Sequence, residues 1–329
     1  MSVDLVQNCY KEGLIGDNAT LIGMKSPTSF LIGTSWNGLL LLEDKANVFS
    51  SELPDSAQYI RDIIYTPHLD SYFLAFNDKL YKKDIDDKPP YPFMNVNCGS
   101  RYGACLGYST RHQRLIINKD SETISLLNTE TRKLEVEMKK KVGNKIMDFR
   151  LLGKDEQRVV SLTGDGHIIL YNLSQPESRG VVSYHRIKLL EKRSEVCRSL
   201  AACGEGKTVL VAIGGFGGCS RMLLFKFVDD NLMNVASIDC LGKGLRSKLA
   251  LECFGSVDTH ILWVGLVKDE GGPAQLYDYD IQTGELKELE DRRVVHHEYY
   301  PYKLHLLGDK LYYIGYYGRL MTLGVGNEQ

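Results

Sequence analysis

The chain has 329 residues, of which 43% are hydrophobic and 25% are charged. This composition is typical of a soluble globular protein and excludes a disordered or fibrous one. Lys and Arg total 40 against 42 Asp and Glu, a formal net charge of −2. We therefore expect no global field that would attract nucleic acid or an anionic membrane.

The sequence opens without the basic and apolar segments of a signal peptide, and its apolar runs, such as Leu39 to Leu42, are too short to span a bilayer. We expect a cytoplasmic or nuclear protein with no membrane association. None of the eight cysteines forms a C-x-x-C pair, so we expect buried free thiols and no zinc site or disulfide framework. They are Cys9, Cys98, Cys105, Cys197, Cys203, Cys219, Cys240 and Cys253.

Short apolar runs separated by turn residues recur along the whole chain and indicate β-hairpins. The first hairpin, Ser29 to Glu43, turns at Asn37-Gly38, and Asn-Gly is a strong hairpin signal. The next predicted turns lie at Asn77-Asp78, Asp120-Ser121, Asp165-Gly166, around Gly217, around Gly271 and at Tyr317-Gly318. Their mean spacing of about 47 residues matches the ~40–50 residues of a four-stranded propeller blade.

Each hairpin follows a further apolar run, and most hairpins precede a more polar one, such as Lys133 to Met138 or Asn231 to Ile238. Three apolar strands and one polar outer strand are the pattern of a propeller blade. The preceding runs are Leu21 to Met24, Ile63 to Tyr65, Ala104 to Tyr108, Ile146 to Leu152, Arg198 to Cys203, Leu249 to Phe254 and Lys303 to Leu307. Ser183 to Cys197 also fits a helix, but the blade count favours an outer strand and a connector.

We therefore predict an all-β fold, a seven-bladed β-propeller of four-stranded antiparallel blades, as a single domain over residues 1–329. The seventh unit has no room for a fourth strand after residue 325. An open strand edge invites association with other chains. Residues 3–10 have apolar side chains at positions 3, 5 and 9 and polar residues between several of them, as an outer strand does. We therefore expect them to pair with residues 318–325 and close the last blade.

Three of these units carry short motifs that resemble the WD-repeat β-propeller family. They are Gly164 to Leu173, where Tyr171-Asn172 stands in place of Trp-Asp, Tyr279 to Leu286, and the more eroded Leu127 to Leu134. The resemblance implies a propeller that assembles with other proteins. The family often uses a buried Asp–His–Ser/Thr–Trp hydrogen-bond network, whereas no Gly-His dipeptide opens a blade here and no Trp-Asp occurs. Thr34 to Gly38 also looks like a turn in propellers of the spindle-checkpoint and messenger-RNA-export group.

The motifs that suggest chemistry have simpler interpretations. Ala201 to Thr208 fits a relaxed phosphate-binding loop, but Lys207-Thr208 runs into an apolar strand and lacks the helix N-terminus that the mechanism requires. His296 and His297 are adjacent, so on a strand they point to opposite faces and cannot easily bind one metal ion. Lys139 to Lys141 is interpreted as a solvated loop between the third and fourth blades. We expect no cofactor, no bound metal and no catalytic residues.

In a propeller, the turns between second and third strands gather on one face with the connections that enter the innermost strands. On this face the sequence places many aromatic and arginine residues, which are the types that dominate protein interfaces. The predicted partner-binding residues are Trp36, Tyr59, Arg61, Arg101, Tyr102, Arg198, Phe216, Arg246, Tyr302 and Tyr317.

The sequence thus predicts a non-catalytic interaction scaffold for a protein or peptide partner, monomeric itself and part of a larger complex. The alternatives are a propeller enzyme with a dispersed site in the central funnel, and a phosphate or nucleic-acid binder that uses the arginine-rich rim.

Overall fold

A computed structural model describes most of the chain. The described residues are 19–34, 38–43, 46–52, 60–76, 78–99, 105–153, 155–175, 181–186, 196–203, 208–215, 218–228, 231–239, 245–257, 260–268, 274–280, 283, 285–294, 304–307, 310–314 and 320–324. Within them, the secondary structure consists of β-strands and one short 3₁₀ turn, η1 (Pro67–Leu69).

The described strands form seven antiparallel sheets, and in six of them four strands follow one another in chain order. The first four sheets are β1 (Ala19–Ser26), β2 (Ser29–Thr34), β3 (Gly38–Glu43), β4 (Ala46–Glu52); β5 (Asp62–Thr66), β6 (Ser71–Ala75), β7 (Lys79–Asp84), β8 (Tyr91–Asn95); β9 (Leu106–Ser109), β10 (Arg114–Lys119), β11 (Thr123–Asn128), β12 (Lys133–Lys139); and β13 (Ile146–Leu152), β14 (Arg158–Thr163), β15 (His167–Asn172), β16 (Val181–Arg186).

The remaining sheets complete the order. They are β17 (Val196–Cys203), β18 (Thr208–Gly215), β19 (Gly218–Val228), β20 (Asn231–Asp239); β21 (Leu245–Val257), β22 (His260–Lys268), β23 (Ala274–Asp280), β24 (Leu286–Val294); and a three-stranded sheet of β25 (Leu304–Leu307), β26 (Lys310–Ile314) and β27 (Leu320–Gly324).

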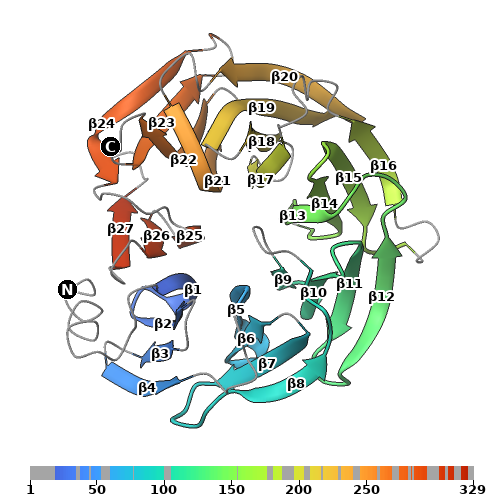
Figure 1. The fold of residues 1–329 in the computed structure, drawn as a ribbon, viewed down its shortest axis with the longest axis vertical. Helices are drawn as coiled ribbons and strands as arrows, with labels where there is room; N and C mark the ends of the chain where they lie inside the picture. The colour runs from blue at the N-terminus through green and yellow to red at the C-terminus, as the bar shows by residue number, and fades with distance from the viewer. Residues whose placement is uncertain are drawn as a thin grey trace.

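The sheets are arranged in a ring, with the first strand of each nearest the centre and the last on the outside (Figure 1). This is the architecture of a β-propeller, and the sheets are its blades. The second and third strands of each blade flank the turn that the sequence predicts. The polar runs Lys133 to Met138 and Asn231 to Ile238 form the outer strands β12 and β20, as expected.

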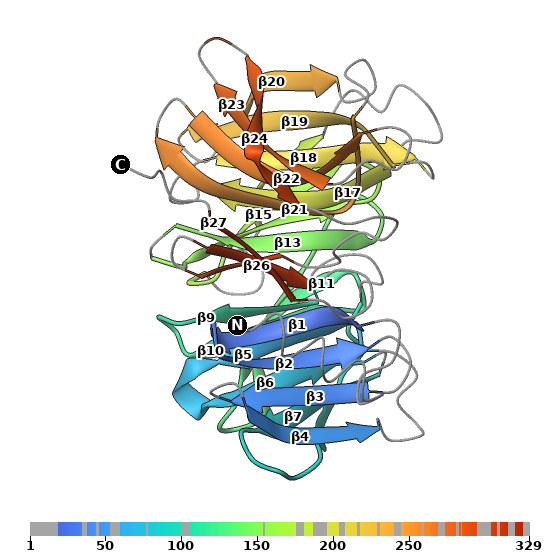
Figure 2. The ribbon, with the colours of Figure 1, turned by 90° about the vertical axis from the view of Figure 1, so that its left-hand side faces the viewer.

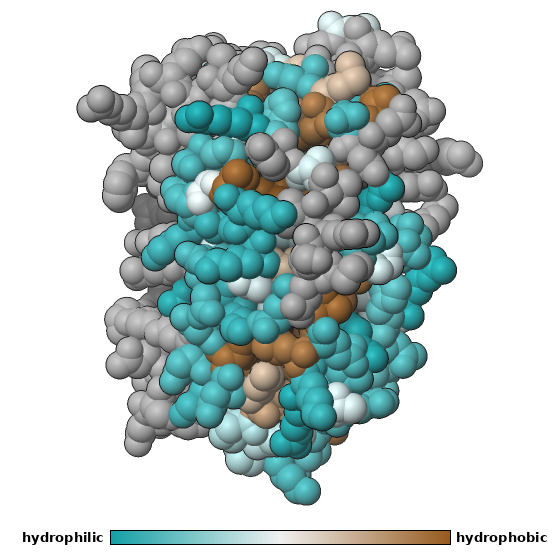
Figure 3. Space-filling view, turned by 90° about the vertical axis from the view of Figure 1, so that its right-hand side faces the viewer, coloured by the Kyte–Doolittle hydropathy of each residue, from teal (hydrophilic) through white to brown (hydrophobic). Residues whose placement is uncertain are grey.

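The blades pack face to face through apolar side chains. One buried cluster joins the second and third blades through Phe73, Leu80, Leu106, Leu115 and Ile117. Similar clusters lie between the first and second, third and fourth, and fourth and fifth blades. The outer wall seen in Figure 3 is largely hydrophilic, with hydrophobic areas between polar ones. The core is therefore divided among the blade interfaces.

The two ends of the described chain are neighbours in the ring. The last sheet lies between the first and the sixth, where β26 contacts β1 and β27 contacts β24 (Figure 2). Residues 3–10, which the sequence predicts to complete this sheet beside β27, lie outside the described residues. The closure and the single domain over residues 1–329 both stay predictions.

Candidate interaction surface

The turns between second and third strands meet the connections that enter the innermost strands, as the sequence predicts. In the fourth blade, the backbone N–H of Gly164 donates to the carbonyl oxygen of Lys145 at 3.1 Å, and the N–H of Asn144 donates to Asp165 Oδ1 at 3.0 Å. In the third blade, Gly99 N–H donates to the carbonyl of Asn118 at 2.8 Å. We call the side of the ring that carries these two classes of loop the upper face.

On the upper face, main-chain hydrogen bonds also link the third, fourth and fifth blades. Ile146 N–H, at the start of β13, donates to the carbonyl of Ser121 in the preceding blade at 2.7 Å. Cys197 N–H, in β17, likewise donates to the carbonyl of Gly164 at 3.1 Å. Main-chain hydrogen bonds thus fix the relative positions of the loops from the third to the fifth blade. This part of the upper face is therefore a preformed surface.

Three of the predicted partner-binding residues belong to the described part of the chain, and all three lie on the upper face. Arg61 directly precedes β5 and is partly exposed. Arg198 is the third residue of β17, and Arg246 is the second residue of β21. The other predicted residues lie outside the described part: Trp36, Tyr59, Arg101, Tyr102, Phe216, Tyr302 and Tyr317.

A polar network supports the upper face of the fourth blade around Asp165. Its carboxylate accepts hydrogen bonds from Thr163 Oγ1 at 2.6 Å and from the N–H of Asn144, while its own N–H donates to Asn144 Oδ1 at 3.1 Å. Burial raises the pKa of Asp165, but these hydrogen bonds and nearby His167 outweigh it, so the pKa lies below its usual value. The ionised carboxylate fixes the turn against the loop that enters β13.

Two aspartates on innermost strands are buried and join neighbouring blades. Asp62 on β5 accepts hydrogen bonds at Oδ2 from the backbone N–H groups of Cys105 and Leu106 in the next blade, at 2.9 and 2.8 Å. Asp148 Oδ2, on β13, likewise accepts a hydrogen bond from the backbone N–H of Leu200, at 2.9 Å. In both aspartates, Oδ1 accepts a hydrogen bond from the backbone N–H of the following residue. No sequence pattern singles out these two residues.

Side chains also connect the blades on the opposite side, here called the lower face. His68 in η1 lies between Tyr108 and Thr129 of the third blade: Tyr108 Oη is 2.7 Å from Nδ1, and Thr129 Oγ1 is 3.0 Å from Nε2. Burial lowers the pKa of His68. Glu156, from the β13–β14 turn, accepts hydrogen bonds from Ser109 Oγ at 2.7 Å and Thr110 Oγ1 at 2.5 Å. The polar groups of His68 and Glu156 therefore have hydrogen-bond partners within the protein, and no ligand is needed to explain their positions.

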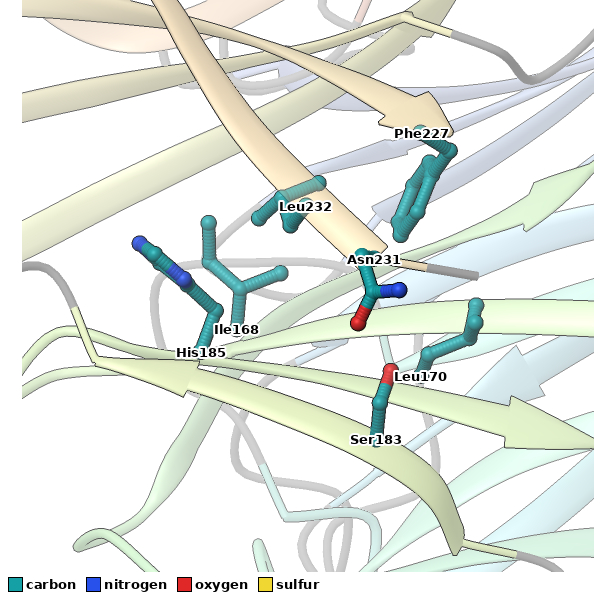
Figure 4. A pocket seen from close by; sticks show the side chains of 7 residues that line it. All are labelled: Ile168, Leu170, Ser183, His185, Phe227, Asn231 and Leu232. Carbon is teal, nitrogen blue, oxygen red and sulfur yellow. The ribbon is translucent and has the colours of Figure 1, made fainter. Parts of the chain in front are cut away.

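A small pocket lies on the outer wall between the fourth and fifth blades (Figure 4). Its volume of about 100 Å³ is below the ~300–1,000 Å³ of sites for drug-sized ligands, and it has room for a single side chain. The residues that line it come from β15, β16, β19 and β20: Ile168, Leu170, Ser183, His185, Phe227, Asn231 and Leu232.

The region that resembles a phosphate-binding loop has the predicted strand–turn–strand geometry. β17 and β18 pair antiparallel, with Cys203 opposite Thr208, and Lys207 lies outside the described residues. A helix N-terminus, which would cradle phosphates, does not follow β17, because Thr208 begins a strand. That Lys207 binds no nucleotide stays a prediction.

The basic run Lys139 to Lys141 lies at the end of β12 and in the loop that leads to β13. Lys139 pairs with Glu122 at 3.2 Å, and Lys140 Nζ donates to the carbonyl of Gly143 at 2.9 Å. Lys141 is exposed. Lys140 and Lys141 thus lie in the loop between the third and fourth blades, as expected, whereas Lys139 is the last residue of β12.

The described residues show neither a metal-binding cluster nor a membrane-spanning helix. Over the described ranges, no three or more His, Cys, Asp and Glu side chains group so that they could hold a metal ion. In the same part of the chain, no helix has the length and apolar character needed to cross a membrane. Cys98, Cys105 and Cys197 are buried thiols, as predicted, and burial raises the pKa of Cys98 to about 12.

Comparison with known proteins supports the fold and leaves the family open. No protein-family model matches the chain, and no curated protein sequence matches it. Among solved structures, 1507 chains match, so the fold alone does not select one function.

Two of these structures show how far the likeness extends. A protein from Lactobacillus plantarum has a TM-score of 0.63 and 10% identity, with 86% of each chain covered. A chain of the mitotic checkpoint complex has a TM-score of 0.66 and 11% identity, with 95% of this chain and 89% of that chain covered. At such identities the likeness is one of fold.

Proposed function

We propose that this protein is a non-catalytic β-propeller scaffold that binds a protein or peptide partner through its upper face. The observation that carries the proposal is the likeness, over 95% of the chain, to a chain of the mitotic checkpoint complex. The upper face suits this role because main-chain bonds between blades hold its loops in place, and a preformed surface loses little entropy on binding. We further propose that the protein is a monomer within a larger cytoplasmic or nuclear complex.

The geometry of the buried carboxylates favours a scaffold over an enzyme. A general acid or base must reach the substrate proton that it transfers. Asp62 and Asp148 lie on innermost strands, where a funnel site would need them, but their oxygens accept hydrogen bonds from backbone N–H groups of their own and the next blade. They are 1% and 2% exposed. Both residues therefore stabilise the ring.

We propose in addition that the chain is a degenerate member of the WD-repeat family. Support comes from the fourth blade, where Gly143-Asn144 stands before β13, at the place of a Gly-His dipeptide. Asn144 and Thr163 both bind Asp165, and Tyr171, in place of tryptophan, is fully buried with its hydroxyl 3.3 Å from Ser161 Oγ. The contacts of Asp165 with Asn144 and Thr163 resemble part of an Asp–His–Ser/Thr–Trp network, while Tyr171 makes a separate contact with Ser161.

The proposal is tested by capturing partners from native extract with the full-length chain and identifying them by mass spectrometry. The test variant carries Trp36→Ala and Phe216→Ala, at two of the partner-binding residues that the sequence predicts. The matched control is Tyr91→Ala, an exposed aromatic at the lower end of β8. We expect the test variant to lose specific partners that the wild type and the control retain.

Two results would contradict the scaffold role. One is a set of captured proteins that is identical for the test variant and the wild type, with both folded by circular dichroism. The other is turnover of a small-molecule substrate that depends on a residue of the upper face.

A further inference from the structure

A run of prolines leads into the outermost strand of the second blade. Residues 88–92 read Lys-Pro-Pro-Tyr-Pro and join β7 to β8, whose first residue is Tyr91. Proline fixes its own φ at about −65° and disfavours helical backbone for the residue before it. Lys88, Pro89 and Tyr91 each precede a proline, so covalent geometry alone favours extended or polyproline II backbone here. We call residues 88–96 the proline segment.

Burial along the proline segment repeats every three residues. Pro90, Phe93 and Val96 are buried, and the residues between them are exposed or partly exposed. A regular strand alternates at every second residue, whereas a polyproline II helix has three residues per turn. The repeat continues into β8 because a β-bulge at Phe93 shifts the pairing with β7 by one residue. The segment thus has one buried row and two exposed rows of side chains.

The buried row fixes the segment on the wall of the propeller. The ring of Phe93 meets the ring of Phe73 edge-on, with centroids 5.0 Å apart, and Arg132 Cζ lies 4.9 Å from the centroid of Phe93. Phe93 and Val96 belong to the buried cluster between the second and third blades. A partner therefore meets a backbone that is already ordered, and less entropy is lost on binding than with a free proline-rich peptide.

The exposed rows place two prolines one turn apart. Pro89 and Pro92 are both exposed and three residues apart, so they share one row. The other exposed row contains Lys88 and Tyr91; the hydroxyl of Tyr91 donates to Asp84 Oδ2 at 3.4 Å, and the residue is 37% exposed. Two prolines at this spacing on a polyproline II face are what domains with aromatic-lined grooves bind. Since only the third row faces the propeller, a groove can enclose both exposed rows.

Protection of the sheet edge accounts for only one of these prolines. β8 is the outermost strand of its blade (Figure 1), and a proline within an edge strand opposes pairing with other chains. Pro92 lies in β8 and has this effect, whereas Pro89 and Pro90 precede the strand. The other described outer strands, β4, β12, β16, β20 and β24, contain no proline. The cluster of prolines in the second blade therefore points to recognition.

We propose that the row of Pro89 and Pro92 is a docking site for a partner domain that binds P-x-x-P sequences in an aromatic-lined groove, the class that includes SH3 and WW domains. The site goes beyond the proposed function, because it lies on the outer wall at the lower end of β8 and uses none of the loops of the upper face. A rigid proline face supplies apolar contact at low entropic cost. The two surfaces allow the protein to hold two partners at once.

The test uses the purified full-length chain and an array of recombinant SH3 and WW domains. The domain that binds most tightly is then titrated by calorimetry. A synthetic P-x-x-P peptide that the same domain binds should compete with the full-length chain, because both occupy one groove. Replacement of an aromatic residue of that groove by Ala should abolish the binding.

The test variant combines Pro89→Ala with Pro92→Ala. The control combines Pro27→Ala with Pro67→Ala, two exposed prolines that belong to no P-x-x-P run. We expect the test variant to bind the selected domain about tenfold more weakly than the wild type or worse, and the control to bind within about twofold of the wild type, because truncation of contacts at the centre of an interface weakens binding most. If the test variant has a lowered melting temperature, Pro89→Ala alone replaces it, since Pro89 precedes the strand, and a smaller loss in the same direction is expected.

The proposal is overturned if no SH3 or WW domain of the array binds, if the test variant binds as tightly as the wild type, or if test and control lose affinity equally. Binding that persists after Ala replaces the groove aromatic would also overturn it. The outcome is independent of the scaffold role, because the variant with Trp36→Ala and Phe216→Ala is expected to bind the selected domain as the wild type does.

Discussion

The carboxylate of Asp148 accepts a hydrogen bond from the backbone N–H of Leu200 at 2.9 Å, across 52 residues of sequence and from one innermost strand to the next. Asp62 repeats the contact with Leu106, at 2.8 Å across 44 residues. The bonds lie at two different blade interfaces, between the fourth and fifth blades and between the second and third.

Removing either carboxylate should destabilise the ring. Asp148→Ala leaves the buried N–H of Leu200 without its acceptor, so we expect a loss of about 2–3 kcal/mol in the free energy of unfolding. Asp148→Asn keeps one oxygen acceptor and should lose less. Urea denaturation measures both, with exposed Asp87→Ala as the control. Equal stability of Asp148→Ala and Asp87→Ala would show that the inter-blade bond contributes little.

Gly107 lies so close to the next blade that a side chain at this position should destabilise the fold. A Cβ at Gly107 would lie 2.9 Å from Cε2 of Phe149, which is 2% exposed and has little room to move. We expect Gly107→Ala to lower the free energy of unfolding by about 1–3 kcal/mol. Phe149→Leu in the same chain should recover part of the loss in thermal unfolding, and an additive pair of losses would argue against direct contact.

The contribution of Glu156 should depend on pH. Burial raises the pKa of Glu156, but hydrogen bonds from Thr110, Ser109 and the backbone of Arg111 outweigh it and bring the pKa below 4.5. A lowered folded-state pKa means that the stabilisation is present above pH 4.5 and is lost as the pH falls through the folded-state value.

We therefore expect Glu156→Gln to be about 1 kcal/mol less stable than the wild type at pH 7. The gap should stay constant down to about pH 5.5 and close toward about pH 3. Chemical denaturation at each pH gives the two free energies. A gap that is the same at pH 3 and pH 7 would exclude the ionised carboxylate as its source.

Substitutions at the predicted aromatic and arginine residues should weaken partner binding without lowering the stability of the fold. We expect single alanine substitutions at Trp36, Arg61, Phe216 and Tyr302 to leave the melting temperature nearly unchanged. Each true hot spot should weaken binding to a captured partner by about 2 kcal/mol or more in calorimetric titration. Strong destabilisation of every variant would instead assign these residues to packing between blades.

The closure of the last blade is tested by truncation. Deleting residues 1–12 should expose the edge of β27 and lower the free energy of unfolding by several kcal/mol or cause aggregation, because an open strand edge recruits other chains. Removing residues 326–329 should have almost no effect. Light scattering and thermal unfolding measure both truncations, and a fully stable, monomeric chain without residues 1–12 would refute the closure.

The sequence predicts the architecture well because its signals are local. The turn at Asp165-Gly166 lies between β14 and β15, with Gly166 at a φ of +89°, which the glycine allows at low cost. The run Ile146 to Leu152 has the same bounds as β13. Alternation and turn chemistry operate over a few residues, so a single sequence contains them.

The contacts between blades could not be predicted in the same way. Nothing around Asp62 or Asp148 in sequence distinguishes them from solvent-exposed acids on a strand, because their partners lie 44 and 52 residues away. Lys83 is similar: its neighbours Lys82 and Asp84 suggest an exposed strand, yet its side chain is fully buried and donates to the carbonyl oxygens of Asp84 and Asp86. The arrangement of the loops on the upper face followed from strand order alone.

The carboxylate bonds of Asp62 and Asp148 end on backbone amides, and every residue except proline supplies such an amide. The receiving blade can therefore exchange its side chains through long evolutionary divergence while the bond persists. A ring held in this way needs only a few fixed positions at its blade interfaces. The bond therefore restricts the sequence of the receiving strand very little, and the chain has only 10–11% identity to two structures of similar fold.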